Sequence, residues 1–235
     1  QPSAIWDDLR DSVAGLTEEP PIDPAALDLD APVRANDAAL VPIRLTQAAD
    51  APPLSDLTLV IDQNPAPVAA EYSFGPALMP LDFEVRVRVN AYSDVRAIGT
   101  QAGGGKVMAG RFVKASGGCS APAGKDMATV EALMGQMRWK TAQQDGRQIG
   151  TLMIRHPMFS GLQRDQVTLL NIPAMFIDRL EVRQGDELLF SMQAGISVSE
   201  DPVFRFAYQP NGQPISVRAE DVDGNLWNQT FEAAG

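Results

Sequence analysis

The chain has 235 residues, with hydrophobic (45%) and charged (21%) fractions that are ordinary for a folded protein and argue against a disordered chain. Its formal net charge of -11, from 19 basic and 30 acidic residues, repels phosphate backbones, so nucleic acid is not an expected partner. One cysteine and one histidine are too few for an intramolecular disulfide, a four-ligand zinc site, a blue-copper site or c-type haem attachment.

The N-terminal segment predicts a short helix followed by an irregular stretch. Trp6 and Leu9 belong to a set of apolar residues at helical spacing, which predicts a helix over residues 4–15. Residues 18–32 are acidic and rich in proline, so we expect an irregular lead-in there. Because the sequence starts at Gln1 without an apolar signal core, we expect a processed chain whose export signal has been removed. No apolar run approaches the roughly 18 residues of a membrane span.

From about residue 33 the pattern changes to the period-two alternation of half-buried strands. In residues 81–89 the apolar residues share one face, while Asp82, Glu84, Arg86 and Arg88 take the other. Further strands are expected at 39–46, 57–62, 68–74, 94–100 and 106–114, separated by turn signals at 62–65, 75–76 and 103–105. Several short strands with regular turns predict a β-sandwich.

A break in the pattern divides the chain into two β-rich halves. Residues 115–128 are small, polar, Gly or Pro, which predicts a flexible linker, and a helical turn or two is expected within 127–137. After residue 138 strands are expected at 147–155, 174–183, 187–194, 202–208, 215–221 and 226–232. Hairpin turns are expected at 184–186 and 210–212.

The only cysteine, Cys119, lies in the linker. Its neighbours are small or polar: Gly117 and Gly118 precede it, and Ser120, Ala121 and Pro122 follow it. A buried structural cysteine normally occupies an apolar periodic segment, so this context predicts an accessible thiol on a mobile arm. Residues 115–128 can span up to about 45 Å when fully extended, a reach that suits a covalent carrier serving separate active sites.

The only histidine, His156, lies in Arg155-His156-Pro157-Met158 near the end of a predicted strand. We favour a structural role in which the imidazole is hydrogen-bonded at a turn. A Cys119–His156 hydrolase dyad is disfavoured, because a flexible arm cannot hold the fixed geometry that such catalysis requires. A Cu(I) site with Met153 is disfavoured because strand alternation separates the two side chains. No metal site is therefore expected.

Over nearly its whole length the sequence resembles a known family, the sulfur-oxidation carrier SoxYZ, with the two subunits fused into one chain. The SoxY-like features cover residues 4 to about 120 and include Asp62-Gln63-Asn64-Pro65-Ala66-Pro67, the strand at 85–89 and the segment GRFVKASGGC at 110–119. The SoxZ-like features cover roughly 138–235 and include His156-Pro157-Met158-x-x-Gly161-Leu162 and Ile172-Pro173-Ala174-Met175-Phe176-Ile177.

The resemblance implies a mainly β protein: two Ig-like antiparallel β-sandwiches with a short N-terminal helix. Its domains would be a SoxY-like sandwich at 1–114, a glycine-rich cysteine arm at 115–137 and a SoxZ-like sandwich at 138–235. Cys119 would hold a sulfur intermediate, such as a persulfide, on a swinging arm that includes Gly117 and Gly118. The family has two glycines after this cysteine, whereas Ser120 and Ala121 stand here, and the arm is tethered at both ends.

The resemblance also implies a periplasmic carrier that is not itself an enzyme and needs no cofactor beyond the covalent adduct. Its partners would be Sox-type enzymes, c-type cytochromes or PQQ dehydrogenases, since the pattern looks closest to fused carriers encoded beside quinoprotein dehydrogenases. A non-covalent adaptor for such a dehydrogenase or cytochrome is the alternative. We expect a monomer, because the fusion already joins the sandwiches, with a Cys119-linked dimer as the other state.

Overall fold

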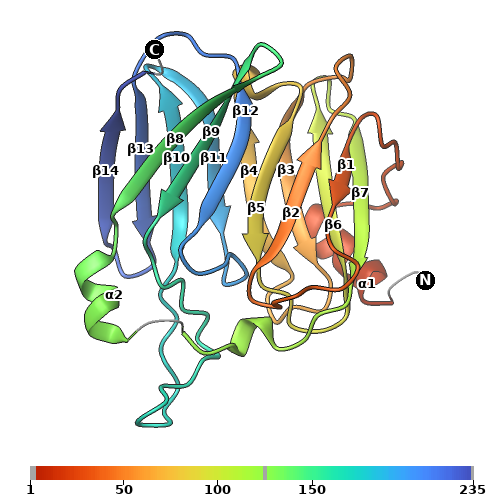
Figure 1. The fold of residues 1–235 in the computed structure, drawn as a ribbon. Coiled ribbons are helices and arrows are strands. Elements are labelled where there is room, and N and C mark those ends of the chain that lie inside the picture. The colour runs from red at the N-terminus through yellow and green to blue at the C-terminus, as the bar shows by residue number, and fades with distance from the viewer. Residues whose placement is uncertain (1–3, 124–125, 234–235) are drawn as a thin grey trace.

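The structure is a computed structural model that describes residues 4–123 and 126–233, so Gln1 and residues 124–125 lie outside it. Two antiparallel sheets lie face to face across one core (Figure 1). The six-stranded sheet has the order β1 (Asp28–Asp30), β2 (Val41–Thr46), β5 (Asp82–Val87), β12 (Val203–Tyr208), β9 (Arg147–Ile154), β8 (Met137–Gln144). The eight-stranded sheet has the order β14 (Leu226–Phe231), β13 (Ile215–Asp221), β10 (Ile177–Gln184), β11 (Glu187–Ala194), β4 (Val68–Phe74), β3 (Leu54–Ile61), β6 (Ser93–Gln101), β7 (Lys106–Val113).

The two halves of the chain have the same strand order and meet edge to edge. Each half contributes three strands to the smaller sheet and four to the larger one, and β1 to β7 occupy the same relative places as β8 to β14. The halves join through two antiparallel pairs, β5 with β12 and β4 with β11. Both sheets therefore run through the whole molecule, as they would across the interface of a symmetric dimer.

A cluster of aromatic side chains fills the core at this junction. Phe83 of β5 is fully buried and packs edge-to-face against Tyr72 and Phe190, with ring centroids 5.0 and 5.1 Å apart. Phe204 and Phe206 of β12 lie 6.4 and 6.3 Å from the same ring. Because Phe83 and Tyr72 come from the first half and the other three from the second, one continuous apolar core spans both halves.

The helix α1 (Ala4–Ala14) packs on the outer side of the eight-stranded sheet, where Trp6 joins Val60 of β3 and Ile98 of β6 in a separate small cluster. Its indole lies under the guanidinium of Arg96, whose Cζ is 4.6 Å from the ring centroid. Arg96 also forms a bidentate ion pair with buried Asp62, which fixes the guanidinium, and the cation–π contact between this guanidinium and Trp6 attaches the helix to the sheet.

The mainly β fold with an N-terminal helix is confirmed, but several details differ from expectation. β1 forms inside the proline-rich lead-in, and an unpredicted strand, β8, follows the short helix α2 (Met127–Leu133), which was expected within 127–137. The turn at 210–212 is not a hairpin, since β12 and β13 belong to different sheets. Arg88 does not face solvent, because residues 196–198 cover it. The domain boundaries at 114 and 138 stay a prediction.

We predict that Phe83→Ala destabilises both halves together, by about 3–5 kcal/mol, because it empties the centre of the shared core. Urea unfolding followed by hydrogen exchange in β6 and in β13 would measure this loss on either side of the junction. Phe112→Ala is the matched control, since Phe112 is exposed on β7 and its loss should change little. Loss of protection in β6 alone would contradict a shared core.

Candidate functional site

Cys119 lies in a short 3₁₀ turn, η2 (Gly118–Ser120), on the segment that crosses from the first half to the second. Figure 1 shows this segment running along one end of the sandwich, beside the loop that follows β9. The side chain of Cys119 is 0% exposed, so the expectation of an accessible thiol is wrong for this structure. Sequence composition missed the burial because the covering groups come from distant parts of the chain.

The backbone of the cysteine segment is hydrogen-bonded to the end of β5. Gly117 N donates to Asn90 O at 2.8 Å, and Gly118 N donates to Val89 O at 3.1 Å. Cys119 N donates to the Asn90 side-chain oxygen at 3.3 Å. Residues 115–123 therefore form a docked arm rather than the free linker that we expected, while residues 124–125 of the predicted linker lie outside the described residues.

Gly118 is required for this docking because a β-carbon there would overlap the backbone of two other segments. A β-carbon at Gly118 would lie 2.2 Å from Ala38 O and 2.7 Å from Val89 O, distances that no side chain can occupy. Gly117 has a positive φ of 76°, which favours glycine, but open space surrounds it. The two arm glycines thus differ: Gly117 sets the turn, and Gly118 permits close approach.

The second half of the chain holds the other side of the docked arm. Ser160 Oγ donates a short hydrogen bond to Cys119 O, and Gln163 Nε2 donates to Ala121 O at 3.0 Å. Ser160 N donates in turn to Gln163 Oε1 at 3.1 Å, which orients the amide. All three groups are carried by the loop after β9, whose outer part exposes the apolar side chains of Val167, Leu169 and Leu170.

Arg88 is a buried cation beside the docked cysteine. Its side chain is 2% exposed, and its Nη1 donates to Val198 O at 2.8 Å and to Ile196 O at 3.2 Å. Burial lowers the pKa of Arg88, while the charges of Cys119 and Glu200 act in the opposite direction. The guanidinium therefore lies close enough to the cysteine for the two groups to influence each other.

The same environment controls the reactivity of the thiol. Burial raises the pKa of Cys119, and the positive charge of Arg88 opposes this only in part. A thiolate is the nucleophilic form of cysteine, so the docked thiol is both protonated and shielded. Chemistry at Cys119 therefore requires the arm to leave this site.

Asn64 connects the parts of the site. Its buried amide donates to Arg88 O at 2.7 Å and to Ser197 Oγ at 2.8 Å, and its oxygen accepts from Asn90 N at 2.8 Å. Asn64 lies within the turn predicted at 62–65, so the sequence marked its position without revealing its contacts. Arg88, Asn90, Ser160 and Gln163 were not predicted as site residues.

Within the described part of the chain, the imidazole of His156 forms no hydrogen bond with Cys119 or with the side chains around that cysteine. Its Nδ1 accepts from Met158 N at 3.0 Å, so Nε2 carries the proton and donates to Asp221 Oδ2 at 3.0 Å. Burial lowers the pKa of His156, against the opposing effect of the Asp221 hydrogen bond. Both ring nitrogens are engaged, neither with Cys119, so the imidazole is not placed as a general base for the thiol.

The residues around His156 form a tight turn. Met158 has a positive φ of 48°, and its buried sulfur accepts from Ile177 N at 3.3 Å. Within the described residues no group of three or more His, Cys, Asp and Glu side chains is arranged to bind a metal ion. We propose that His156, Pro157 and Met158 are a structural motif of the second half.

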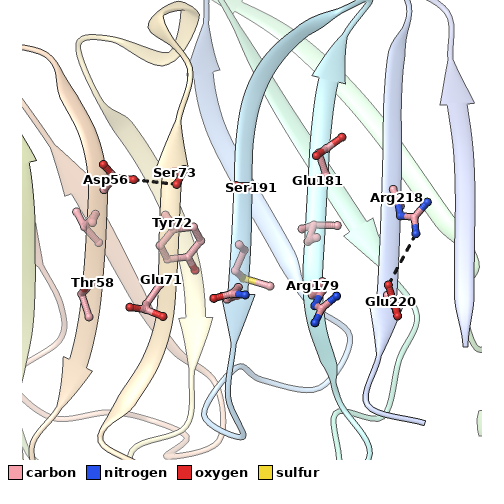
Figure 2. Close-up of a pocket in the computed structure, with 14 residues that line it drawn as sticks. Asp56, Thr58, Glu71, Tyr72, Ser73, Arg179, Glu181, Ser191, Arg218 and Glu220 are labelled. Atoms are coloured by element: carbon pink, nitrogen blue, oxygen red, sulfur yellow. Dashed lines mark hydrogen bonds and ion pairs between the residues drawn. The ribbon is translucent and has the colours of Figure 1, made fainter. Parts of the chain in front are cut away.

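A hollow on the eight-stranded sheet lies away from Cys119. It has a volume of about 530 Å³ and crosses the outer face of the eight-stranded sheet at the junction, between β3 and β13 (Figure 2). Figure 2 shows charges of both signs there, with Asp56 bonded to Ser73 and Arg218 paired with Glu220. No cysteine lines it, so it offers no thiol that could replace Cys119 as the candidate site.

Comparison with known proteins identifies both halves. Residues 13–119 match the family model "Sulfur oxidation protein SoxY", and residues 137–232 match "Sulphur oxidation protein SoxZ". No curated protein matches the chain. No helix among the described residues is long and apolar enough to cross a bilayer.

Two solved structures are similar to parts of the chain. The sulfur carrier protein SoxY from Chlorobium limicola f thiosulfatophilum is 21% identical over 48% of this chain and 92% of its own, with a TM-score of 0.39. A β-glycosidase from Bacteroides vulgatus is 7% identical over 88% of this chain and 25% of its own, with a TM-score of 0.25. Neither likeness is close enough to carry an argument about chemistry.

We predict that Gly118→Ala displaces the arm and exposes the thiol, because the new β-carbon would overlap the carbonyls of Ala38 and Val89. Alkylation of Cys119 by iodoacetamide, followed by intact mass spectrometry, should be at least about tenfold faster than in the unaltered protein, a change equal to the loss of one or two hydrogen bonds. Gly110→Ala is the matched control, since its β-carbon would have ordinary contacts. Equal alkylation rates in all three proteins would show that the arm is not docked in solution.

We also predict that His156 makes stability depend on pH. Because its folded pKa lies below the ordinary 6.5, its neutral form stabilises the fold above that pH, and this contribution is lost as the pH falls toward the folded value. The free energy of unfolding should decrease by up to about 1.4 kcal/mol between pH 7.5 and 5.5. His156→Gln should remove this dependence, and an unchanged slope in denaturant titrations would contradict it.

Proposed function

Because the chain belongs to the SoxY and SoxZ families of sulfur-oxidation proteins, joined in one polypeptide, we propose that it is a carrier that holds a sulfur intermediate covalently on Cys119. In this proposal the chain performs no catalysis of its own. Partner enzymes load, oxidise or release the cargo, and the arm at 115–123 presents it to them.

The position of Cys119 is the observation that carries the proposal. It is the only cysteine in the chain and the last residue of the SoxY match. Ser160, a residue within the SoxZ match, donates to its carbonyl oxygen. A cysteine that was only a core filler would not need a glycine-rich segment held by hydrogen bonds from both halves.

Two states of the arm account for the chemistry. In the docked state the thiol is buried and its raised pKa keeps it protonated. In the undocked state the thiol is free to ionise, to attack a sulfur electrophile and to carry the resulting adduct into a partner's active site. Gly117 and Gly118 support this change, because glycine allows backbone movement that other residues resist.

The compartment, oligomeric state and partners of the carrier are proposed from its family relationship. We place the protein in the periplasm, as a monomer, with Sox-type enzymes, c-type cytochromes or PQQ dehydrogenases as partners. The junction between β4 and β11 and between β5 and β12 supports the monomer, because it buries within one chain the edges that would otherwise pair with another chain. Since the arm is tethered at both ends, a partner must accept a loop and not a free chain end.

We predict that Cys119→Ser abolishes cargo loading while leaving the fold intact, because serine has nearly the same size but cannot form a sulfur–sulfur bond. Loading would be measured by intact mass spectrometry after incubation with polysulfide, whose sulfane sulfur is transferred to the thiolate while a shorter polysulfide leaves. Turnover would be measured with extract from the native host. The control is Ser116→Ala, which alters the arm but keeps the thiol. Full turnover with Cys119→Ser would refute the proposal.

The complete burial of Cys119 favours one alternative, a non-covalent adaptor in which the cysteine is incidental. An adaptor would bind its dehydrogenase or cytochrome equally well with or without the thiol and would support turnover in the Cys119→Ser form. Pull-down of partners and turnover measured on the same variant therefore separate the two functions.

A further inference from the structure

Among the residues that the structure describes, Arg88 is a buried positive charge without a carboxylate in an ion pair with it. It is 2% exposed, and no Asp or Glu of the described residues forms an ion pair with it. The charge of Glu200 also acts on Arg88 and raises its pKa, against the effect of burial. Burying a cation without an opposite charge is costly, and arginine remains ionised even when buried, so this arrangement calls for an anion that the thiol form of the site does not supply.

The orientation of the guanidinium leaves part of its donor fork free. Both of its hydrogen bonds within the described residues are made by Nη1, to the carbonyls of Ile196 and Val198. Nε and Nη2 have no hydrogen-bond partner there. A guanidinium fork binds an anion through two adjacent N–H groups, and the Nε and Nη2 edge is the edge that remains.

The docked arm brings Cys119 to this cation. The arm is hydrogen-bonded to Val89 and Asn90, the two residues that follow Arg88 in the chain. The charges of Arg88 and Cys119 act on each other, which places the sulfur in the field of the guanidinium. A negative charge added at the end of the Cys119 side chain would therefore lie in the field of Arg88.

We propose that Arg88 binds the negatively charged end of the cargo on Cys119 when the arm is docked, so that the site favours anionic adducts over neutral ones. This inference rests on the proposed function, since it requires cargo on Cys119. The persulfide anion is the smallest such cargo, because it adds a single charged sulfur atom. The docked arm is then least stable with the bare thiol and most stable with the loaded anion. Loading of the cargo therefore favours docking of the arm.

The test compares two adducts of the same size and different charge. The persulfide is made from a mixed disulfide, Cys119–S–S–Ar + HS⁻ → Cys119–S–SH + ArS⁻, where ArS⁻ is 5-thio-2-nitrobenzoate, and it loses a proton to give Cys119–S–S⁻. The neutral adduct is made with methyl 4-nitrobenzenesulfonate, Cys119–S⁻ + CH₃–O–SO₂Ar′ → Cys119–S–CH₃ + Ar′SO₃⁻. Each adds one heavy atom to the cysteine sulfur.

Docking would be measured as hydrogen exchange of the arm amides at 117–119, under anaerobic conditions, in the full-length protein. We expect exchange to be at least about tenfold slower in the persulfide form than in the S-methyl form, the effect of one charge-assisted hydrogen bond. Arg88→Met should remove this difference. Arg86→Met should keep it, because Arg86 lies exposed on β5 and its loss changes the net charge equally.

Equal exchange in the two adducts of the unaltered protein would overturn the proposal, and this comparison needs no variant, so it stands even where Arg88→Met does not fold. Persistence of the difference in a folded Arg88→Met protein would overturn it as well. No partner enzyme takes part, so failure here leaves Cys119 as the carrier residue, whereas turnover by Cys119→Ser would refute the carrier function itself.

Discussion

The edge-to-edge pairing of the two halves is the constraint on which the site depends. β5 pairs with β12 and β4 with β11, and the aromatic cluster around Phe83 fills the space between them. This pairing brings residues 88–90, which directly follow β5, against residues 196–198, and it sets the loop at 160–163 beside the cysteine arm. Neither half alone could bury Cys119, because each supplies only part of its surroundings.

Docking has a chemical consequence that follows from its geometry. A buried thiol with a raised pKa does not react with oxidants or stray electrophiles, whereas an exposed lone thiol would. Ser160 and Gln163 donate to carbonyls of the arm and Asn90 accepts from Cys119 N, and each of these hydrogen bonds is worth roughly 0.5–1.5 kcal/mol. Hydrogen bonds of this strength are compatible with the release of the arm that we propose.

The sequence predicted local patterns well and long-range contacts poorly. Period-two alternation identified most strands, since each buries one face of alternating residues such as Phe83 and Val85. It missed β8, where the burial pattern after Met137 is almost wholly exposed, so no alternation marks the strand. It misplaced Arg88, because that position continues the polar face of β5 and only the distant segment at 196–198 covers it.

The site shows the same division between local and distant information. Cys119, Gly117 and Gly118 could be found because the residues themselves are unusual in composition and position. The docked state could not, because it depends on Ser160, Gln163 and Asn64, which approach the arm only after the halves have paired. The close approach at Gly118 is visible only once Ala38 O is in place.

The central claim is that Cys119 carries sulfur, and intact mass spectrometry of the protein isolated from its native host without reductant tests it most directly. The account predicts a reducible, sulfur-containing adduct that maps by peptide fragmentation to Cys119. An unmodified thiol, which also stays unmodified when the protein is incubated with sulfide, polysulfide or thiosulfate and native extract, would contradict it.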